Sequence, residues 1–294
     1  MSAIQPAKGM TTIVSKLANL TGLSLISILE TQMQDSKNVP PTGAKKDLLK
    51  KLLPYFYRSP VSAFYNYHFY RLLRFARRLS ETVRPEDTLL DVGAGDCQYK
   101  PLFIGRCKYI SQDIGGKDDN FTYDQIDIRS EIYNIPLPNE SVDIILCTQV
   151  LEHLKYPTQA LQEMHRLLKP GGKLYLSVPF ASEEHMMPYD YFRYTRFSLA
   201  FLMREQGFNP LMIDPHGGRF ITLGKNIKDL FPLMALGRPR LQKILYSIQS
   251  PVVLPILFIL FWMDGIDKNK HMTQNYDVIA EKIGPDPKCT APLS

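Results

Sequence analysis

Short apolar runs alternate with amphipathic stretches between about residue 85 and residue 215. Apolar runs of strand length lie at 89–92, 109–114, 142–148 and 173–178, and two later ones lie at 211–214 and 276–281. Apolar residues at helical spacing separate the third and fourth runs, ending at Pro170-Gly171-Gly172, and Thr195 and Gly207 can cap a further helix. Strands separated by helices predict an α/β fold with a parallel, doubly wound sheet and right-handed crossovers.

The same pattern divides the chain into a sheet domain and flanking parts. In the part before the sheet, Pro54 and Ser59-Pro60 are predicted to separate helical segments. We expect a flexible or amphipathic N-terminal segment at 1–43, a basic helical cap at 44–84, the sheet domain at 85–216 and 274–284, an apolar helical insertion at 217–273, and a tail at 285–294.

The insertion contains the most apolar stretch of the chain. Residues 244–263 are twenty residues without a charge, a length that by itself suggests a membrane-spanning helix. Pro251 and Pro255 are expected to break that helix, and the run at 276–281 must return to the same sheet. We therefore expect a helical hairpin or cap that dips into a membrane face or covers an apolar acceptor. Simple burial against the N-terminal helices is the alternative.

Charge is unevenly distributed over the 294 residues. The formal net charge is +6, but residues 44–84 carry ten Lys or Arg against Asp47 and Glu81, so the remainder sums to −2. This favours a localised anionic partner, either a phosphorylated substrate or an anionic membrane surface, over general nucleic-acid binding. A nucleic-acid acceptor is further disfavoured because the chain has no Asn-Pro-Pro-Tyr type signature and no recognisable RNA-binding module.

The four cysteines give no metal or disulfide signature. They show neither CxxC nor Cys/His spacing, and the first 29 residues lack a clean signal peptide because Lys16, Thr21 and Ser24 interrupt the apolar positions. We expect reduced cysteines, no metal site and a cytoplasmic protein, with peripheral membrane association as a further candidate. The oligomeric state stays open.

A glycine loop follows the first apolar run. Gly93 and Gly95 lack a Cβ, so the backbone can approach a ligand closely at the start of a helix. Such a pair also occurs in nicotinamide enzymes, but Gln98 stands where their GxGxxG pattern needs a third glycine. Asp113 ends the next run, twenty residues after Gly93, where a carboxylate can accept hydrogen bonds from both ribose hydroxyls.

Asp127 and Ile128 follow at the point where a third strand would end. A side-chain acceptor and a backbone N–H there can read an adenine edge. Taken alone, Asp91, Asp113 or Asp127 fits a turn or a helix cap equally well. Their joint spacing around one glycine loop favours a nucleoside-containing cofactor.

Four stretches between residues 88 and 180 carry a family resemblance: LLDVGAGD, YISQDI, IPLPNESVDIILCTQVLEHL and ALQEMHRLLKPGGKLYLSVP. They resemble the class I S-adenosylmethionine-dependent methyltransferases, in particular the type 11 methyltransferase domain. The resemblance implies a Rossmann-like sheet of seven strands with the last strand antiparallel. It implies S-adenosylmethionine as the cofactor, lying over the carboxyl ends of the first strands.

The resemblance also assigns cofactor contacts. It shows one departure, Cys97, where members commonly have glycine. Glu152 and His153 lie one turn after Gln149, where positioning of the helix is favoured over a chemical role. The cofactor-binding residues that the resemblance implies are Asp91 before the glycines, Gly93 and Gly95 on the methionine and ribose side, Asp113 at the ribose, Asp127 and Ile128 at the adenine, and Gln149 near the reacting centre.

The segment 180–195 follows the fifth strand of this fold, whose carboxyl end faces the acceptor. His185, Asp190 and Arg193 are its candidate catalytic residues. His185 is the candidate general base, with a loop-stabilising role as the alternative. Arg193 can grip a phosphate or carboxylate of the acceptor, or it can clasp Asp190; the sequence leaves both open.

These observations predict a methyltransferase that acts on a small-molecule, lipid or glycan acceptor, most simply by O-methylation. Two alternatives are a nicotinamide-dependent Rossmann oxidoreductase and a catalytically silent, methyltransferase-like binding module. Neither the acceptor nor the choice among O-, N- and C-methylation follows from the sequence.

Overall fold

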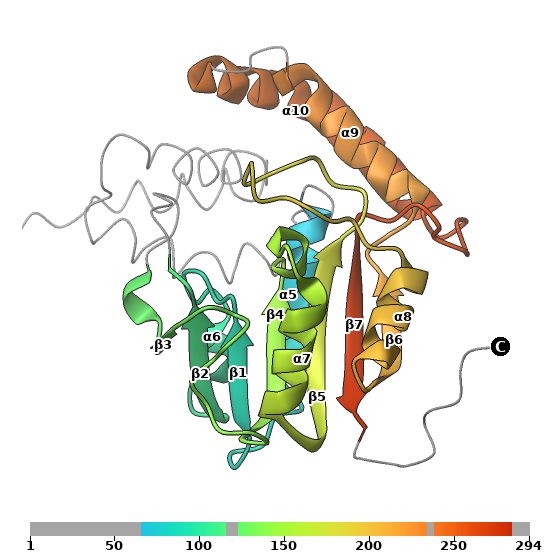
Figure 1. The fold of residues 1–294 in the computed structure, drawn as a ribbon. Helices are drawn as coiled ribbons and strands as arrows, with labels where there is room; N and C mark the ends of the chain where they lie inside the picture. Colours follow the sequence, from blue (N-terminus) through green and yellow to red (C-terminus); the bar gives the residue numbers. More distant parts are fainter. Residues whose placement is uncertain (1–65, 116–122, 234–237, 284–294) are drawn as a thin grey trace, which may run out of the picture. The chain divides into compact units, whose positions relative to one another are not determined.

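A computed structural model describes residues 66–115, 123–233 and 238–283 (Figure 1). The chain divides into two compact units. Of the described residues, 66–67, 223–233 and 238–265 belong to one unit, and 68–115, 123–222 and 266–283 belong to the other, which contains the sheet. The expected N-terminal segment, the helix breaks near Pro54 and Ser59-Pro60, and the tail lie outside the described residues.

The sheet has seven strands in the order β3-β2-β1-β4-β5-β7-β6. Strands β1 to β5 pair in parallel, and β7 runs antiparallel to both of its neighbours. This confirms the predicted Rossmann-like sheet with an antiparallel last strand. The strands are β1 (Thr88–Val92), β2 (Lys108–Asp113), β3 (Ile128–Arg129), β4 (Val142–Thr148), β5 (Leu168–Pro179), β6 (Phe208–Pro215) and β7 (Asn275–Lys282).

Helices cover both faces of the sheet, so its central strands are buried on both sides. On one face, Phe75 of α5 packs with Leu89; on the other, Met164 of α7 packs with Leu90. Thr195 caps α8 by accepting a hydrogen bond from the backbone N–H of Ser198, as predicted. The helices that cover the two faces are α5 (Tyr67–Ser80), α6 (Lys100–Phe103), α7 (Pro157–Leu167) and α8 (Arg196–Glu205); two 3-10 turns are η2 (Tyr123–Gln125) and η3 (Leu151–His153).

Strand β5 begins earlier than the sequence pattern predicts. The helix α7 ends at Leu167, and Leu168 already pairs with Val142 of β4, so the Pro-Gly-Gly stretch lies inside β5. A register shift between Val142 and Ile144 accommodates it, and Gly171 adopts a φ of 75°. The Pro-Gly-Gly stretch therefore forms an irregularity of the strand instead of terminating the helix.

The insertion between β6 and β7 forms two helices, α9 (Arg219–Leu233) and α10 (Pro239–Met263). Within the unit that holds 223–265, the Gln249 side chain donates to the Lys228 carbonyl at 2.7 Å, and a Cβ on Gly224 would lie 3.0 Å from Leu257 Cδ2. The two helices thus pack side by side in opposite directions.

The expectation that prolines break the insertion helix is wrong. Helix α10 runs through both Pro251 and Pro255. The two prolines lie four residues apart and are exposed, so their rings share the outer face, while Val253 and Leu257 are buried. We attribute the continuity of the helix to this packed apolar face, which stabilises it despite the missing N–H donors.

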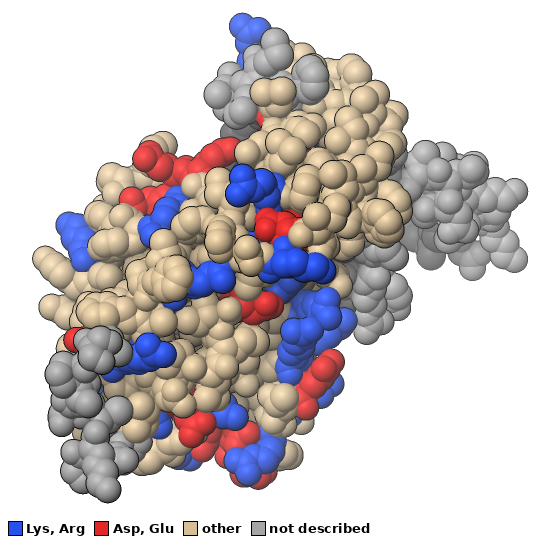
Figure 2. Space-filling view, turned by 90° about the vertical axis from the view of Figure 1, so that its right-hand side faces the viewer, with Lys and Arg blue, Asp and Glu red and all other residues tan. Residues whose placement is uncertain are grey.

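Within the described ranges, no helix is long and apolar enough to cross a membrane. Helix α10 nevertheless exposes large apolar side chains, including Ile248, Val252 and Trp262. On the face drawn in Figure 2, Lys and Arg side chains are interspersed with Asp and Glu and do not gather into one basic stripe. Contact of the insertion with a membrane stays a prediction.

Candidate active site

The glycine loop lies directly after β1, at the carboxyl edge of the parallel strands. Gly93 and Gly95 adopt φ values of 69° and 56°, in the region that favours glycine. The N–H of Gly93 donates to the carbonyl of Gln112 at 2.9 Å. A Cβ on Gly93 would lie 2.4 Å from Val150 Cγ2, so no other residue fits without displacing the segment after β4.

Asp113 at the end of β2 holds this loop in place. Its two carboxylate oxygens accept hydrogen bonds from the N–H of Gly95 at 2.9 Å and the N–H of Gly115 at 2.8 Å. The parallel pairing of β1 with β2 brings the glycine loop and this carboxylate together, as the sequence spacing predicts. A carboxylate has about four acceptor positions. Asp113 therefore retains acceptor capacity for a ligand.

Asp91 lies under the loop and is almost fully buried. The hydroxyl of Tyr109 donates a short hydrogen bond to Asp91 Oδ2. Burial raises the pKa of Asp91 to about 7; the Tyr109 hydrogen bond opposes this rise, and the nearby charge of Asp113 adds to it. This hydrogen bond links β1 to β2 just before the glycine loop.

Asp127 is exposed and bonded to β2. Its Oδ2 accepts hydrogen bonds from the N–H and the hydroxyl of Ser111 at 2.9 and 2.7 Å. Desolvation alone would raise the pKa of Asp127, but the hydrogen bonds from Ser111 lower it below the usual value. Ile128 begins β3 opposite Gln112. Both residues lie near the cofactor loop, and their contact with adenine stays a prediction.

Gln149 and Cys97, two non-glycine residues near the glycine loop, have positive φ values. Gln149, with φ of 56°, follows β4, and its side-chain Nε2 donates a hydrogen bond to Asn275 Oδ1 at 2.9 Å. Cys97 has φ of 57°, in the region that favours glycine, the residue that the family resemblance leads us to expect there. Strained residues of this kind concentrate at ligand sites.

The segment after β5 is held by an ion pair. Arg193 donates to both carboxylate oxygens of Asp190 at 2.7 Å and also to the carbonyl of Glu183 at 2.9 Å. Asp190 in turn accepts from the backbone N–H of His185 at 2.9 Å. The hydrogen bonds from Arg193 hold the pKa of Asp190 well below its usual range. Of the two roles left open for Arg193, the structure shows the clasp with Asp190.

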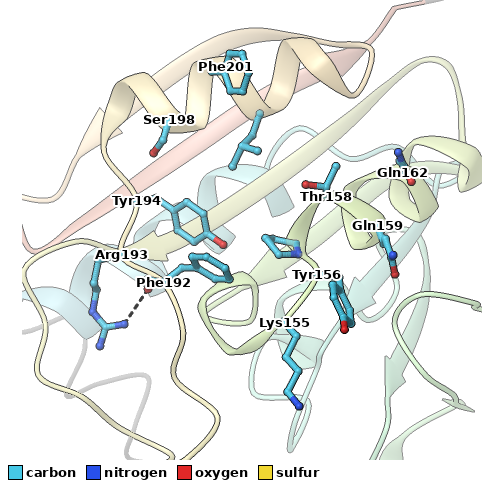
Figure 3. Close-up of a pocket in the computed structure, with 12 residues that line it drawn as sticks. Lys155, Tyr156, Thr158, Gln159, Gln162, Phe192, Arg193, Tyr194, Ser198 and Phe201 are labelled. Carbon is cyan, nitrogen blue, oxygen red and sulfur yellow. Dashed lines mark hydrogen bonds between the residues drawn. The ribbon is translucent and has the colours of Figure 1, made fainter.

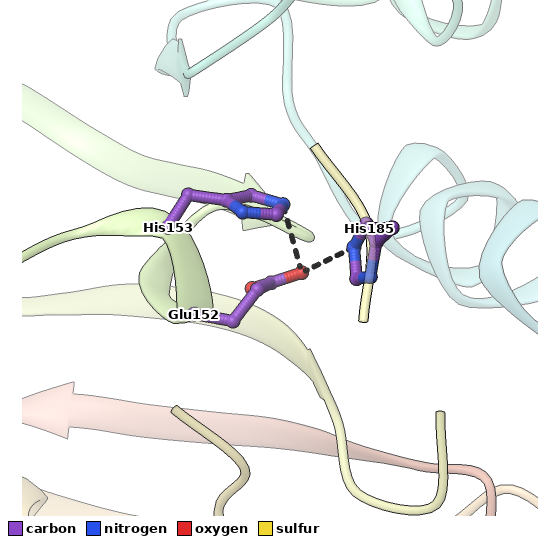
Figure 4. A group of neighbouring side chains, drawn as sticks. All are labelled: Glu152, His153 and His185. Atoms are coloured by element: carbon purple, nitrogen blue, oxygen red, sulfur yellow. Dashed lines mark ion pairs between the residues drawn. The ribbon is translucent and has the colours of Figure 1, made fainter. Parts of the chain in front are cut away.

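Next to this clasp, Glu152, His153 and His185 form a cluster that the sequence analysis did not predict (Figure 4). Glu152 Oε1 lies 3.7 Å from His153 Nε2 and 3.9 Å from His185 Nε2. The Glu152 carboxylate is fully buried, and burial raises its pKa to about 8. We call these three residues the Glu–His–His cluster.

The signal for this cluster was present in the order of the elements. Glu152 and His153 follow β4, and His185 follows β5; these strands are parallel neighbours, with Thr148 opposite Ser177 near their carboxyl ends. Residues after two such ends meet at one edge of the sheet. The sequence analysis placed Glu152 and His153 in a helix-positioning role and so did not connect them with His185.

A surface pocket of about 720 Å³ lies between the start of α7 and the helix α8 (Figure 3). Phe192, Tyr194 and Phe201 give it an aromatic lining, and Lys155 and Arg193 add positive charge at its rim. None of the residues assigned to the cofactor lines it. The pocket shares only the loop 192–194 with the clasp and is separate from the glycine loop.

Comparison with known proteins places these features in context. A family model described as "Methyltransferase domain" matches residues 64–213. The chain is 41% identical over 58 residues to a probable S-adenosylmethionine-dependent methyltransferase of Mycolicibacterium smegmatis, covering 19% of this chain and 23% of that protein. It is 31% identical over 103 residues to a ubiquinone/menaquinone biosynthesis C-methyltransferase of Pseudoalteromonas translucida, covering 34% and 38%.

The chain thus spans less than half the length of these curated relatives. Among solved structures, an S-adenosylmethionine-dependent methyltransferase from Archaeoglobus fulgidus superposes with a TM-score of 0.49 at 15% identity, covering 75% of this chain and 97% of that one.

Proposed function

The chain belongs to the methyltransferase domain family, and from this membership we propose that it transfers a methyl group from S-adenosylmethionine to an oxygen of a small-molecule, lipid or glycan acceptor. The observation that carries the proposal is the glycine loop held by Asp113 at the carboxyl edge of the sheet, beside the Glu–His–His cluster. Family membership also disfavours the nicotinamide oxidoreductase considered from the sequence.

The residues around the loop fit the cofactor. Glycine at 93 lets the loop pack against Val150, and the loop lies at the carboxyl edge of the sheet, where ligands of this fold bind. Asp113 would accept from the ribose hydroxyls, and Asp127 with the N–H of Ile128 would hold the adenine edge. Asp91 and Gln149 would act on the methionine moiety of the cofactor indirectly. Asp91 would do so through the conformation of the glycine loop, and Gln149 through that of the segment after β4.

S-adenosylmethionine, when bound, supplies an electrophilic methyl group. The protein's part is to orient the acceptor, exclude water and take the proton of an acceptor hydroxyl. His185 is placed to take the proton, because its side chain is 38% exposed and so can be reached by an acceptor. Its Nδ1 lies 3.1 Å from the Glu183 carbonyl, and its Nε2 lies 3.9 Å from Glu152 Oε1. Asp190 and Arg193 position His185 through the clasp.

The choice of oxygen rests on this histidine. Among the relatives, one is by name a C-methyltransferase and another a ubiquinone biosynthesis O-methyltransferase, 27% identical over 108 residues, so the family alone leaves the acceptor atom open. A hydroxyl acceptor needs a group that takes its proton. The buried, acceptor-rich cluster beside the expected position of the methyl group supplies such a group.

The experiment that tests the proposal is transfer of a labelled methyl group. The full-length protein is incubated with methyl-labelled S-adenosylmethionine and with lipid extracts, phosphorylated glycans and small hydroxylated compounds, and labelled products are separated by class. We expect the label in a product in which the new methyl group is bonded to oxygen, as a methyl ether. His185→Ala should reduce turnover about 100-fold or more, as expected for loss of a proton-accepting group.

The matched control is His271→Ala, which removes an exposed histidine outside the cluster and should leave turnover unchanged. Turnover of His185→Ala within a few-fold of the parent protein would contradict the role of His185. Label on carbon or nitrogen would contradict the choice of oxygen while leaving methyl transfer intact.

A further inference from the structure

The Glu152 carboxylate lacks the partners that a buried charge requires. The side chain is 0% exposed, and neither of its oxygens has a hydrogen-bond partner among the described residues. Leaving a buried carboxylate unpaired is costly, so such groups are normally paired, protonated or bound to a metal. Arg193, whose charge acts on Glu152, already donates to both oxygens of Asp190.

The two histidines face Glu152 with nitrogen atoms that carry lone pairs. His153 Nδ1 lies 2.7 Å from the Tyr189 carbonyl and His185 Nδ1 lies 3.1 Å from the Glu183 carbonyl. A carbonyl only accepts, so each Nδ1 is assigned the proton and each Nε2 the lone pair. Both Nε2 atoms therefore point lone pairs at a carboxylate that is itself only an acceptor when ionised.

The spacing of these three acceptors matches a shared cation. The ligand atoms of Glu152, His153 and His185 all lie within 4.8 Å of one another, and Oε1 is 3.7 and 3.9 Å from the two Nε2 atoms. Ligands bound to one ion at about 2.0–2.2 Å lie about 3–4 Å apart. The two distances from Glu152 are too long for direct hydrogen bonds and suit a bridging ion, and the two histidine nitrogens, which lie within 4.8 Å, would move closer together on binding one.

We propose that Glu152, His153 and His185 bind a divalent transition-metal ion. Two imidazoles and one carboxylate form a ligand set typical of zinc and non-haem iron sites, in which the remaining positions are open to water or substrate. The imidazole ligands favour such ions over Mg²⁺, which prefers oxygen ligands. The cysteine pattern predicts no metal site, and the proposed ligands contain no cysteine.

The surrounding contacts are those that hold histidine ligands in place. The Tyr189 and Glu183 carbonyls fix the orientation of the two rings, and the Asp190 carboxylate lies 3.4 Å from His185 Nδ1. Carboxylates and carbonyls behind ligating histidines raise their basicity and fix their tautomer. The half-exposed His185 leaves the cluster open on one side, which gives an ion a path of entry.

Resting on the proposed function, the ion would hold the acceptor hydroxyl and lower its pKa, and His185 would then act as a ligand and not as the free base. The lone pair of His185 Nε2 cannot accept a proton and coordinate a metal ion at the same time. Metal dependence of methyl transfer distinguishes the two. The binding test itself needs neither cofactor nor acceptor.

Cobalt binding to the full-length protein tests the inference. The protein is stripped with a chelator and titrated with Co²⁺, whose visible absorption reports coordination by nitrogen and oxygen. We expect near-stoichiometric binding, displacement of Co²⁺ by Zn²⁺, and no displacement by Mg²⁺. Glu152→Gln keeps the shape of the side chain and removes its charge, and it should weaken Co²⁺ binding about 100-fold.

His185→Ala provides a second variant, in a partly exposed loop where folding is less at risk, and should weaken Co²⁺ binding similarly. His271→Ala, the exposed histidine outside the cluster, should bind as the parent does. Absence of a cobalt spectrum in the parent, or equal affinity in parent, Glu152→Gln and His185→Ala, would overturn the inference. S-adenosylmethionine titration of the same samples tests the proposed function separately, so either can fail alone.

Discussion

Asp113 and Glu152 are carboxylates at the same edge of one sheet, yet their surroundings are opposite. Asp113 accepts backbone N–H groups on both oxygens and is half-buried. Glu152 is fully buried, has no hydrogen-bond partner among the residues described, and faces two histidine nitrogens. The first carboxylate is satisfied by the fold; the second depends on a proton or a bound cation.

The proposed site therefore has two unlike sides. The cofactor side is held rigidly by backbone hydrogen bonds, whereas on the acceptor side the protein leaves the Glu152 carboxylate without a partner among the described residues. Around Gly93 and Asp113, backbone hydrogen bonds fix the loop before any ligand is bound, so the loop loses little conformational freedom when a ligand binds. Around Glu152, the clasp of Arg193 with Asp190 fixes the position of His185 but leaves the carboxylate itself unsatisfied.

Gly93→Ala should have the largest effect, because it attacks the rigid side. The Cβ would clash with Val150 at a φ of 69°, and we expect a loss of about 3 kcal/mol of unfolding free energy from overpacking and backbone strain together. Gly105→Ala is the matched control: its φ is 75° and no atom lies within 4 Å, so only about 1 kcal/mol should be lost. Equal losses in urea denaturation would show that the loop is not closely packed.

Asp113→Asn and Glu152→Gln compare the two carboxylates directly. In chelator, Asp113→Asn should lose about 1–3 kcal/mol, because an N–H of the loop loses its charged acceptor. Glu152→Gln should lose little or nothing at neutral pH, because burial raises the pKa of Glu152 to about 8 and the amide replaces a largely protonated carboxyl without removing a hydrogen bond. The urea midpoint at constant m-value measures both. A greater loss for Glu152→Gln would reverse the comparison.

Asp91 adds a pH dependence to the cofactor side. Burial raises its pKa to about 7, so between about pH 4 and pH 7 the folded protein keeps a proton that the unfolded chain has released. Stability contributed by this group is therefore lost as the pH rises through that window, by at most about 1.4 kcal/mol per pH unit. Asp91→Asn should flatten the curve of unfolding free energy against pH. Parallel curves for the two proteins would contradict the raised pKa.

The smallest expected effect concerns the insertion. Trp262 is the only tryptophan of the chain and is 82% exposed on α10. If the insertion contacts an anionic membrane, its fluorescence should shift to shorter wavelength on addition of vesicles containing phosphatidylserine, and not with phosphatidylcholine alone. An unchanged spectrum with both vesicles would remove membrane contact by this helix from the account.

Much of the fold follows from the sequence because its signals are local. The strand Val142–Thr148 has the predicted bounds, and Thr195 caps α8 as expected, since an apolar run and a capping side chain act within a few residues. The glycine loop and Asp113 were predicted together for a related reason. In a parallel sheet, successive strands end at one edge, so sequence order sets spatial order.

The remaining features depend on contacts between distant residues. The continuity of α10 through Pro251 and Pro255 depends on its packed face, which no local rule contains. The clasp of Arg193 with Asp190 depends on the conformation of one loop, so the sequence left two roles open. The Glu–His–His cluster requires the pairing of β4 with β5, because its members come from the ends of both strands.

The central claim is that the loop held by Asp113 binds S-adenosylmethionine, and calorimetric titration tests it most directly. The full-length protein is titrated with S-adenosylmethionine and separately with NADH, alongside Asp113→Ala and the control Asp124→Ala, which removes an exposed carboxylate on η2. We predict binding of S-adenosylmethionine but not NADH, weakened about 100-fold in Asp113→Ala and unchanged in Asp124→Ala. Absence of binding by the folded parent protein, or equal binding by Asp113→Ala, would contradict the claim.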